Sequence, residues 1–205
     1  CSYCIIPYAR GRIRSRAPRD VLGEIRNLAE AGFQEFVLTG IHLASYGRDL
    51  EKTDLISLMK DISAIEGVKR IRLGSLEPTL LTEDFLKAVS KMPKVCRHFH
   101  LSLQSGCDDT LKRMNRRYNT AEYRDIVLRL RSFIPDVAIT TDIMVGFPGE
   151  TQEEFNKTYN FVKEIGFSRI HVFKYSPREG TPAAKFKSQV PGIEKENRSR
   201  QLIAL

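Results

Sequence analysis

The stretch Pro18–Leu38, PRDVLGEIRNLAEAGFQEFVL, is typical of a helix followed by a stop and a strand. Its first part predicts a helix over Pro18–Ala31, because the apolar residues recur at the spacing of one helix face. Gly32 then suits the left-handed conformation in which many helices end. The β-rich run Phe33–Leu38 follows and predicts a strand. Repetition of this unit, a helix followed by a strand, determines the fold class.

The same order recurs four more times along the chain. Two repeats also have a glycine stop: Asp54–Ile65, Gly67 and Val68–Leu73, then Thr151–Ile165, Gly166 and Ile170–Tyr175. Two repeats lack it: Thr82–Lys91 with His98–Leu103, and Ala121–Phe133 with Val137–Val145. Thr151 and Glu154 have the spacing of a capping box, and the charged tail Gly192–Leu205 predicts a final helix or the start of a linker. Strands separated by helices run parallel with right-handed crossovers. The pattern therefore predicts a β/α barrel, complete or partial, or an open doubly wound sheet.

Composition narrows the class of protein. The 205 residues contain 33 Lys+Arg and 25 Asp+Glu, which gives a net charge of +8, with 28% charged and 41% hydrophobic residues. This balance excludes disorder and fits one soluble domain. No apolar run approaches the length of a membrane span. Four cysteines do not make a disulfide scaffold, so we expect a reducing cytoplasm. The chain begins at Cys1 without Met or a targeting segment, so we expect it to be part of a longer protein.

Polar, glycine-rich segments follow each predicted strand. They are Thr39–His42, Gly74–Pro78, Gln104–Cys107, Gly146–Glu150 and Ser176–Arg178. In β/α barrels such loops build the active site. Ordinary turn chemistry explains any one of them, whereas all five together favour a shared pocket. Gly146 and Gly149 precede a helix, where backbone N–H groups favour anionic ligands.

Cys1 and Cys4 form a CxxC motif, which is typical of a metal, a cluster or a redox disulfide. The segment Cys4–Arg16, CIIPYARGRIRSR, follows it. These residues resemble the cluster loop of the radical S-adenosylmethionine (SAM) enzymes, in particular the methylthiotransferases. That family reads CxxxCxxC, so Cys1 and Cys4 match its second and third cysteines, and the first would lie upstream of Cys1. Five later segments also resemble the family, in its order: Val37–Gly40 with Tyr46 and Gly47, Leu73–Pro78, His98–Gly106, Thr141–Thr151 and His171–Arg178.

The resemblance implies a fold and cofactors. We expect residues 1–205 to be a radical SAM core domain, a partial parallel (β/α) TIM-like barrel whose first strand lies upstream. It implies a [4Fe–4S] cluster on Cys1, Cys4 and an upstream third cysteine, with SAM bound at the free iron. The resemblance also implies a second [4Fe–4S] cluster in an N-terminal domain, and we expect that domain and a C-terminal TRAM domain to be absent from residues 1–205. The implied cofactor-binding residues are Thr39, Gly40, Ser75, Glu77, Gln104, Val145, Gly146, Phe147 and Phe173. Two ordinary roles remain open. The apolar residues among them can simply belong to the core, and Glu77 can simply be the residue at which a helix begins.

Two basic stretches predict an RNA contact. Their candidate residues are Arg10, Arg12, Arg14 and Arg16, then Lys112, Arg113, Arg116 and Arg117. A solvated face is the ordinary explanation of such runs. Arginines beside a predicted active-site loop also suit a phosphate backbone, with Tyr8 and Tyr118 available for stacking. We expect RNA binding that depends on salt and reads shape.

The resemblance implies a methylthio group added to C2 of threonylcarbamoyladenosine next to the anticodon of tRNA. In the implied reaction, SAM cleavage yields a 5′-deoxyadenosyl radical that takes hydrogen from C2; sulfur is inserted, and a second SAM donates the methyl group. The Cys96–Cys107 and Leu111–Arg116 stretches favour this branch. Isopentenyladenosine in tRNA, a ribosomal protein or another protein substrate, and a non-catalytic zinc or RNA-binding module are the alternatives. We expect a monomer that takes electrons from a flavodoxin- or ferredoxin-like donor, with residues 1–205 inactive alone.

Overall fold

The computed structural model describes residues 1–205, which divide into two compact units. Unit 1 comprises Cys1–Gly11, Leu101–Leu128 and Ile139–Leu205, and unit 2 comprises Arg12–His100 and Arg129–Ala138. None of the helices combines the length and the apolar character needed to cross a membrane.

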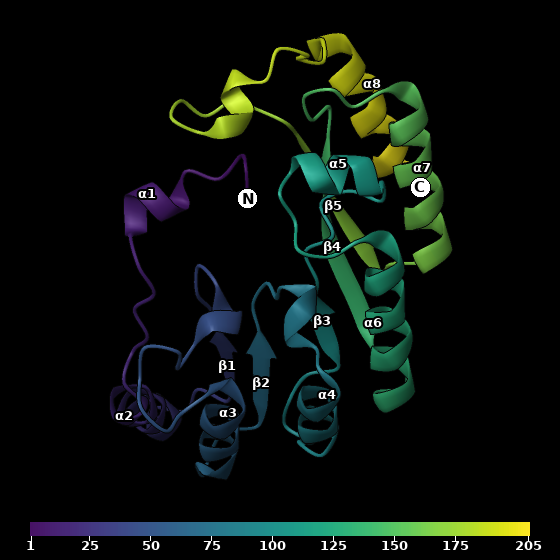
Figure 1. The fold of residues 1–205 in the computed structure, drawn as a ribbon. Helices are drawn as coiled ribbons and strands as arrows, with labels where there is room; N and C mark the ends of the chain where they lie inside the picture. Colours follow the sequence, from purple (N-terminus) through teal and green to yellow (C-terminus); the bar gives the residue numbers. More distant parts are fainter. The chain divides into compact units, whose positions relative to one another are not determined.

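Unit 2 alternates helices with short strands (Figure 1). In chain order they are α2 (Pro18–Glu30), β1 (Glu35–Leu38), a 3₁₀ turn (Leu43–Ser45), α3 (Leu55–Ala64), β2 (Arg70–Leu73), a 3₁₀ turn (Pro78–Leu80), α4 (Glu83–Ser90) and β3 (His98–His100). β1 and β2 are parallel, with Glu35 opposite Arg70 and Leu38 opposite Leu73. The parallel pairing follows from the intervening helix, as expected for helices and strands in alternation.

Local chemistry starts the helices of unit 2, and apolar faces hold them on the strands. Pro18 is the first residue of α2, where its missing N–H costs nothing. The Asp54 carboxylate caps α3 by accepting from the Ser57 amide at 2.7 Å, and the Thr82 hydroxyl caps α4. Ile62 of α3, Ile71 of β2 and Leu86 of α4 are fully buried. Burying each such side chain contributes roughly 1.5–3 kcal/mol.

Unit 1 contains one short helix near the start of the chain and most of the elements from α5 onward (Figure 1). They are α1 (Ile6–Arg10), α5 (Asp108–Arg113), α7 (Gln152–Ile165), β5 (Arg169–Lys174), a 3₁₀ turn (Pro182–Lys185) and α8 (Gly192–Ile203). Two further elements, α6 (Thr120–Phe133) and β4 (Ala138–Val145), have residues in both units. β4 and β5 are parallel, from Thr140 opposite Arg169 to Val145 opposite Lys174. α8 packs on β5.

The predicted helices and strands are confirmed with shifts of a few residues at their ends. Gly32, Gly67 and Gly166 all have positive φ, as their predicted positions at helix ends require. The capping box of Thr151 and Glu154 is present, and the tail forms α8. The strand predicted over His98–Leu103 is shorter, since β3 ends at His100. α1 and α5 were not predicted, because five or six residues are too few for a periodic pattern.

Candidate cofactor site

The CxxC turn is fixed to unit 1 by the residues between its cysteines. Cys1 and Cys4 are free thiols, one exposed and one half-buried. The Cys4 amide donates to the Cys1 carbonyl at 3.5 Å. Buried Ser2 donates its amide to the Met114 carbonyl at 2.9 Å and its hydroxyl to the Arg113 carbonyl at 2.8 Å. The turn is therefore anchored at the C-terminal end of α5.

Tyr3 joins the CxxC turn to the segments that follow β3 and β4. Its hydroxyl donates to Gln104 Oε1 at 3.1 Å. Its ring meets Phe147 edge to face, with centroids 6.0 Å apart. Gln104 has φ of 70°, a left-handed conformation that is uncommon for a residue other than glycine. Such conformations concentrate at functional sites, so this contact marks the candidate site.

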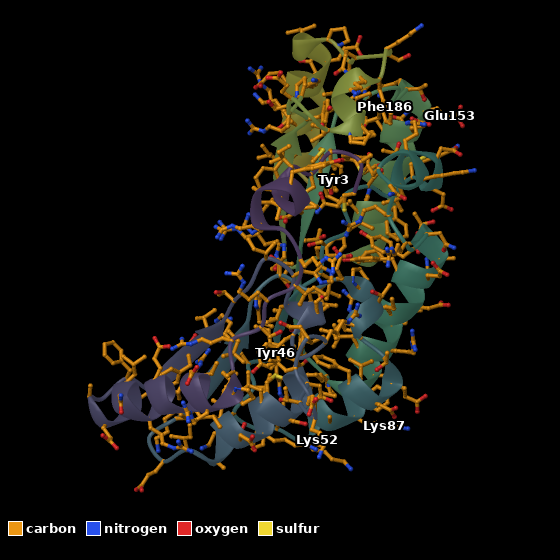
Figure 2. All side chains as sticks on the ribbon, turned by 60° about the vertical axis from the view of Figure 1, so that its left-hand side comes forward. Tyr3, Tyr46, Lys52, Lys87, Glu153 and Phe186 are labelled. Carbon is orange, nitrogen blue, oxygen red and sulfur yellow. The ribbon has the colours of Figure 1, made fainter.

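An apolar cluster lies under the turn. It consists of Met114, Phe147, Tyr175 and Ala183, with Tyr3, Met144 and Phe186 packed against it. Tyr3 and Phe186 are labelled in Figure 2. Phe147 and Val145 are almost wholly buried, whereas Phe173 on β5 is 54% exposed. The structure thus places Phe147 in the core that supports the site, the ordinary role left open for it, and Phe173 at the surface.

The loop Gly146–Glu150 uses its amides within the chain. The Gly146 amide donates to Glu150 Oε1 at 3.1 Å, and the Glu150 amide donates to the Phe147 carbonyl. The Gly149 amide donates to the Ser188 carbonyl at 2.6 Å. At the start of α7, the Thr151 amide donates to Glu154 and the Glu154 amide to Thr151. The expectation of an anion-binding loop is therefore wrong here, because these donors already have acceptors.

The donor chemistry of the CxxC turn fits iron–sulfur ligation. Fe–S clusters are held by cysteine thiolates, and both thiols are outside any disulfide. Arg116 Nη1 donates to Cys1 Sγ at 3.0 Å, so a cation faces a sulfur atom that carries negative charge as a ligand. The Arg116 guanidinium lies 5.0 Å from the centre of the Tyr118 ring, which fixes its position. The two thiols suit the predicted cluster, and their role as its ligands stays a prediction.

The remaining predicted cofactor residues belong to unit 2. Thr39 and Gly40 are exposed just after β1, and Ser75 is exposed after β2. Glu77 is half-buried and precedes the turn Pro78–Leu80 without a side-chain capping bond. All four follow strand ends, as predicted. Because the other predicted cofactor residues belong to unit 1, a pocket shared by the two groups stays a prediction.

Asp49 holds the arginine-rich segment of unit 2, a role that the sequence analysis missed. Its carboxylate accepts from the Ser15 amide at 2.8 Å and from the Ser15 hydroxyl at 2.5 Å. The Gly47 amide donates to Ser15 Oγ, and the Tyr46 hydroxyl donates to the Arg16 carbonyl at 3.0 Å. These bonds, here called the Ser15 clasp, keep the pKa of Asp49 below its ordinary value. The only sequence signal was the position of Asp49 just after Tyr46 and Gly47.

The first group of predicted RNA-binding residues is exposed: Arg10 at the end of α1, then Arg12, Arg14 and Arg16. Arg14 and Arg16 flank Ser15, so the clasp holds the backbone between them. Arg16 also pairs with Glu24. Tyr8 is 71% exposed and available for stacking, as predicted.

The second group divides between the surface and internal contacts. Lys112 and Arg117 are exposed. Arg113 binds Glu154 through both nitrogens, at 2.9 and 2.5 Å, and donates from Nε to the Pro148 carbonyl at 3.2 Å. Arg116 contacts Cys1. The stacking predicted for Tyr118 is wrong, because its ring is buried and its hydroxyl donates to backbone carbonyls of Ser102 and Leu103.

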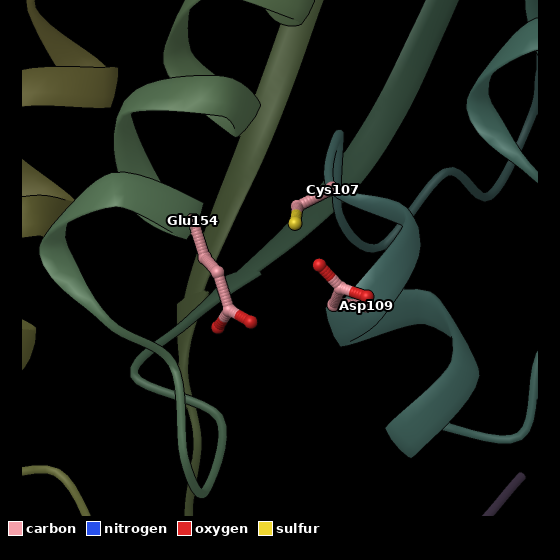
Figure 3. A group of neighbouring side chains, drawn as sticks. All are labelled: Cys107, Asp109 and Glu154. Carbon is pink, nitrogen blue, oxygen red and sulfur yellow. The ribbon is translucent and has the colours of Figure 1, made fainter.

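Glu154 also belongs to a trio with Cys107 and Asp109, whose ligand atoms lie within 4.8 Å of one another (Figure 3). The Glu154 oxygens already accept from Arg113, Thr110 and the Thr151 amide. Glu154 therefore serves the Arg113 ion pair and the α7 cap, and we do not assign a metal to this trio.

Comparison with known proteins identifies the family of the chain. The sequence model of the Radical SAM superfamily matches residues 1–162. Across its whole length the chain is 45% identical to threonylcarbamoyladenosine tRNA methylthiotransferase of Bacillus subtilis, and covers 46% of that protein. Over 99% of its length it is 45% identical to tRNA-2-methylthio-N(6)-dimethylallyladenosine synthase of Clostridium botulinum, and covers 45% of it. The chain thus spans about half the length of these relatives.

Two solved structures share the fold at low sequence identity. Coproporphyrinogen III oxidase from Escherichia coli has a TM-score of 0.63 at 16% identity, covering 94% of this chain and 47% of its own. Methylornithine synthase has a TM-score of 0.61 at 20% identity, covering 100% and 58%. The predicted α/β class with parallel strands and the resemblance to the methylthiotransferases are confirmed. Because the superfamily model matches most of its residues, the chain belongs to the radical SAM superfamily.

Proposed function

We propose that the protein is a radical SAM methylthiotransferase that modifies C2 of threonylcarbamoyladenosine next to the anticodon of tRNA. One observation carries the proposal: Tyr3, between the two cysteines, contacts both Gln104 after β3 and Phe147 after β4. This contact supports one site shared by the CxxC turn and the loops after β3 and β4. The relatives named above methylthiolate tRNA adenosines, which supports the substrate class.

Cys1 and Cys4 are proposed to hold the [4Fe–4S] cluster with one further cysteine of the full-length protein. When bound, the cluster supplies the electron that cleaves SAM. The chain's own part is to hold and shield the ligands: Ser2 anchors the turn, Arg116 donates to Cys1, and Tyr3 fixes Gln104. A second cluster, a flavodoxin- or ferredoxin-like electron donor, a monomeric state and a cytoplasmic location stay predictions.

The loop Gly146–Glu150 is proposed to receive the adenine end of SAM. Its occupied amides do not suit a phosphorylated cofactor, whereas SAM carries no phosphate. Carbonyl oxygens and short side chains after the strand ends are the groups left to bind it. The proposed set is Thr39, Gly40, Ser75, Glu77, Gln104, Val145, Gly146 and Phe173, with Phe147 supporting the loop from the core.

The exposed arginines of residues 10–16 are proposed to bind the tRNA backbone. They carry positive charge without an acidic residue among them, and the Ser15 clasp holds Arg14 and Arg16 on an ordered segment. Arginine binds phosphate through two parallel hydrogen bonds. Lys112 and Arg117 are the exposed members of the second group, while Arg113 and Arg116 contribute mainly through their contacts inside unit 1.

Dimethylallyladenosine in tRNA is the second candidate substrate, because the Clostridium botulinum relative matches at the same 45% identity. The contacts of the described site do not distinguish the two adenosines. The ribosomal-protein and zinc-module alternatives have no such observation in their favour.

The decisive experiment expresses the full-length protein in a bacterial strain that lacks its own tRNA methylthiotransferases. Mass spectrometry of the tRNA nucleosides is expected to show 2-methylthio-threonylcarbamoyladenosine. The variant Cys4→Ser, which removes a proposed cluster ligand, is expected to abolish the product and lower the iron content. Cys96→Ser, which changes a free thiol in unit 2, is the matched control and should keep both.

Each other outcome contradicts part of the proposal. Methylthio-dimethylallyladenosine alone would assign the second substrate. Unmodified tRNA in the presence of a reconstituted cluster would exclude both. Stoichiometric zinc in place of iron in anaerobically purified protein would favour the zinc module.

A further inference from the structure

The loop Gly146–Glu150 is held from the side by α8, which lies beyond the residues that the superfamily model matches. Arg198 of α8 donates from Nη1 to Glu150 Oε1 at 2.7 Å and to the Glu150 carbonyl at 3.0 Å. Both side chains are almost completely buried, at 4% and 3% exposure. A buried ion pair of this kind ties the end of the loop to the helix.

The ion pair is formed by the last residue of the loop, and the same carboxylate also binds the first residue. The Glu150 oxygen that accepts from Arg198 also accepts from the Gly146 amide at 3.1 Å. Gly146 has φ of 68°, a conformation that glycine adopts without strain, and the bond to Glu150 fixes its amide in that turn. The carboxylate thus closes the loop from Gly146 to Glu150, and Arg198 orients it. Burial raises the pKa of Glu150, while the Gly146 amide and the Arg198 charge oppose that shift.

A second residue of α8 acts on the same loop and on the segment after β5. Lys195 donates from Nζ to the Tyr175 carbonyl at 2.9 Å and lies 5.2 Å from the centre of the Tyr175 ring. Its methylene chain packs on Gly146, where an added Cβ would come within 3.0 Å of Lys195 Cδ. Arg198 itself lies over the Phe155 ring of α7. One turn of α8 therefore holds the loop, α7 and the end of β5 together.

We propose that Arg198 is a positioning residue for SAM: through Glu150 it keeps the Gly146–Gly149 loop in the conformation that receives the cofactor. This inference rests on the proposed role of that loop. Arg198 does not touch SAM, because its own side chain is buried against Glu150 and Phe155. Without the Arg198–Glu150 ion pair, the loop is no longer held in this conformation. The affinity for SAM therefore falls more than kcat does.

The test uses the full-length protein with its cluster reconstituted anaerobically. Arg198→Met removes the charge at similar volume, and Arg198→Lys keeps it. Arg200→Met is the matched control, since Arg200 lies on the same helix, 74% exposed, and pairs with Glu196. Isothermal titration gives the dissociation constant for SAM, and steady-state SAM cleavage gives KM and kcat separately.

We expect Arg198→Met to raise the dissociation constant and KM for SAM at least tenfold, with a smaller change in kcat and with iron content and tRNA affinity unchanged. Arg198→Lys should recover most of the affinity, and Arg200→Met should equal the wild type. A role in folding alone would lower the SAM affinity, kcat, iron content and tRNA affinity together. If Arg198→Met does not fold, the double variant Glu150→Gln/Arg198→Met removes the unpaired buried charge and should fold with the same weak SAM binding.

A SAM affinity within twofold of the wild type, in folded Arg198→Met or in folded Glu150→Gln/Arg198→Met, overturns the proposed role of Arg198. Failure of the proposed function has a different signature, in which the wild-type protein itself neither binds SAM nor modifies tRNA. A wild type that binds SAM with an unaffected Arg198→Met variant therefore rejects only the inference about Arg198.

Discussion

At the scale of single residues, the candidate site depends on backbone conformations and close approaches in the loop after β3. Gln104 keeps a left-handed φ of 70°, which costs a residue with a Cβ about 1 kcal/mol or more. Its neighbours are fixed to α7: the Gly106 amide donates to Thr158 Oγ1 at 3.2 Å, and the Ser105 hydroxyl bonds the same oxygen at 3.1 Å. The loop is held by these contacts against its own strain.

The absence of a side chain at Gly106 is required by this packing. A Cβ there would lie 2.7 Å from Phe161 Cβ and 2.9 Å from Thr158 Cα. We expect Gly106→Ala to lower the free energy of unfolding by about 1–3 kcal/mol, as overpacking does, measured by urea denaturation.

The matched control is Gly23→Ala in α2, where an added Cβ meets nothing within 4 Å. There the better helix propensity of alanine should raise the free energy of unfolding by up to about 1 kcal/mol. Equal stabilities of the two variants would contradict the packing argument.

At the scale of helices and loops, hydrogen bonds at the ends of segments hold the functional side chains in position. The Ser15 clasp orders the residues between α1 and α2, a stretch without regular secondary structure, by attaching Ser15 to Asp49 and Arg16 to Tyr46. A capping box fixes the start of α7, because the side chains of Thr151 and Glu154 each accept from the other residue's backbone amide. The clasp and the capping box both pair side-chain oxygens with backbone polar groups.

We expect Asp49→Asn to open the clasp and to weaken binding of a tRNA anticodon stem-loop several-fold, measured by fluorescence anisotropy. Hydrogen exchange at the Ser15 amide should speed up in the same variant. Asp61→Asn, at an exposed position on α3, is the control and should change neither. Unchanged exchange at Ser15 would show that the clasp does not order the segment.

The clasp also has a defined dependence on pH. The pKa of Asp49 is lowered by the hydrogen bonds from Ser15, so its stabilising effect is present above the ordinary pKa of aspartate, about 4. The effect is lost as pH falls through the lower value of the folded state. Titration of the Asp49 carboxyl by NMR should show a midpoint below the ordinary aspartate value of about 4. A midpoint at or above that value would contradict the clasp.

At the scale of the whole molecule, the charge excess of 33 basic over 25 acidic residues acts locally. Several cations are paired with acids of the same chain: Arg113 with Glu154 and Arg198 with Glu150 largely away from solvent, and Arg124 with Glu164 at the surface. Residues 10–16 keep their arginines at the surface. We therefore expect any polyanion contact at that segment.

We expect tRNA binding to weaken with salt, because bound cations release counterions from the phosphates. The double variant Arg14→Ala/Arg16→Ala should reduce the slope of log K against log salt by about 1.5, roughly 0.7–0.9 for each lost phosphate contact. The control Lys60→Ala/Lys69→Ala removes two exposed charges elsewhere in unit 2. Equal slopes for the two double variants would exclude a phosphate contact by Arg14 and Arg16.

The sequence alone determined the order of helices and strands, their parallel class and the family. Periodic apolar residues, glycine stops and the Thr151 capping box act over a few residues, so spacing reveals them. Tertiary structure decided which side chains are free to act. Glu150 meets Arg198 across 48 positions of the chain, Arg113 meets Glu154 across 41, and Tyr3 meets Gln104 across 101. Such pairs form because burial removes water and makes each polar group find a partner, and no local pattern specifies that partner. The same cause made Tyr118 and Phe147 core residues and gave the Gly146, Gly149 and Glu150 amides acceptors inside the chain.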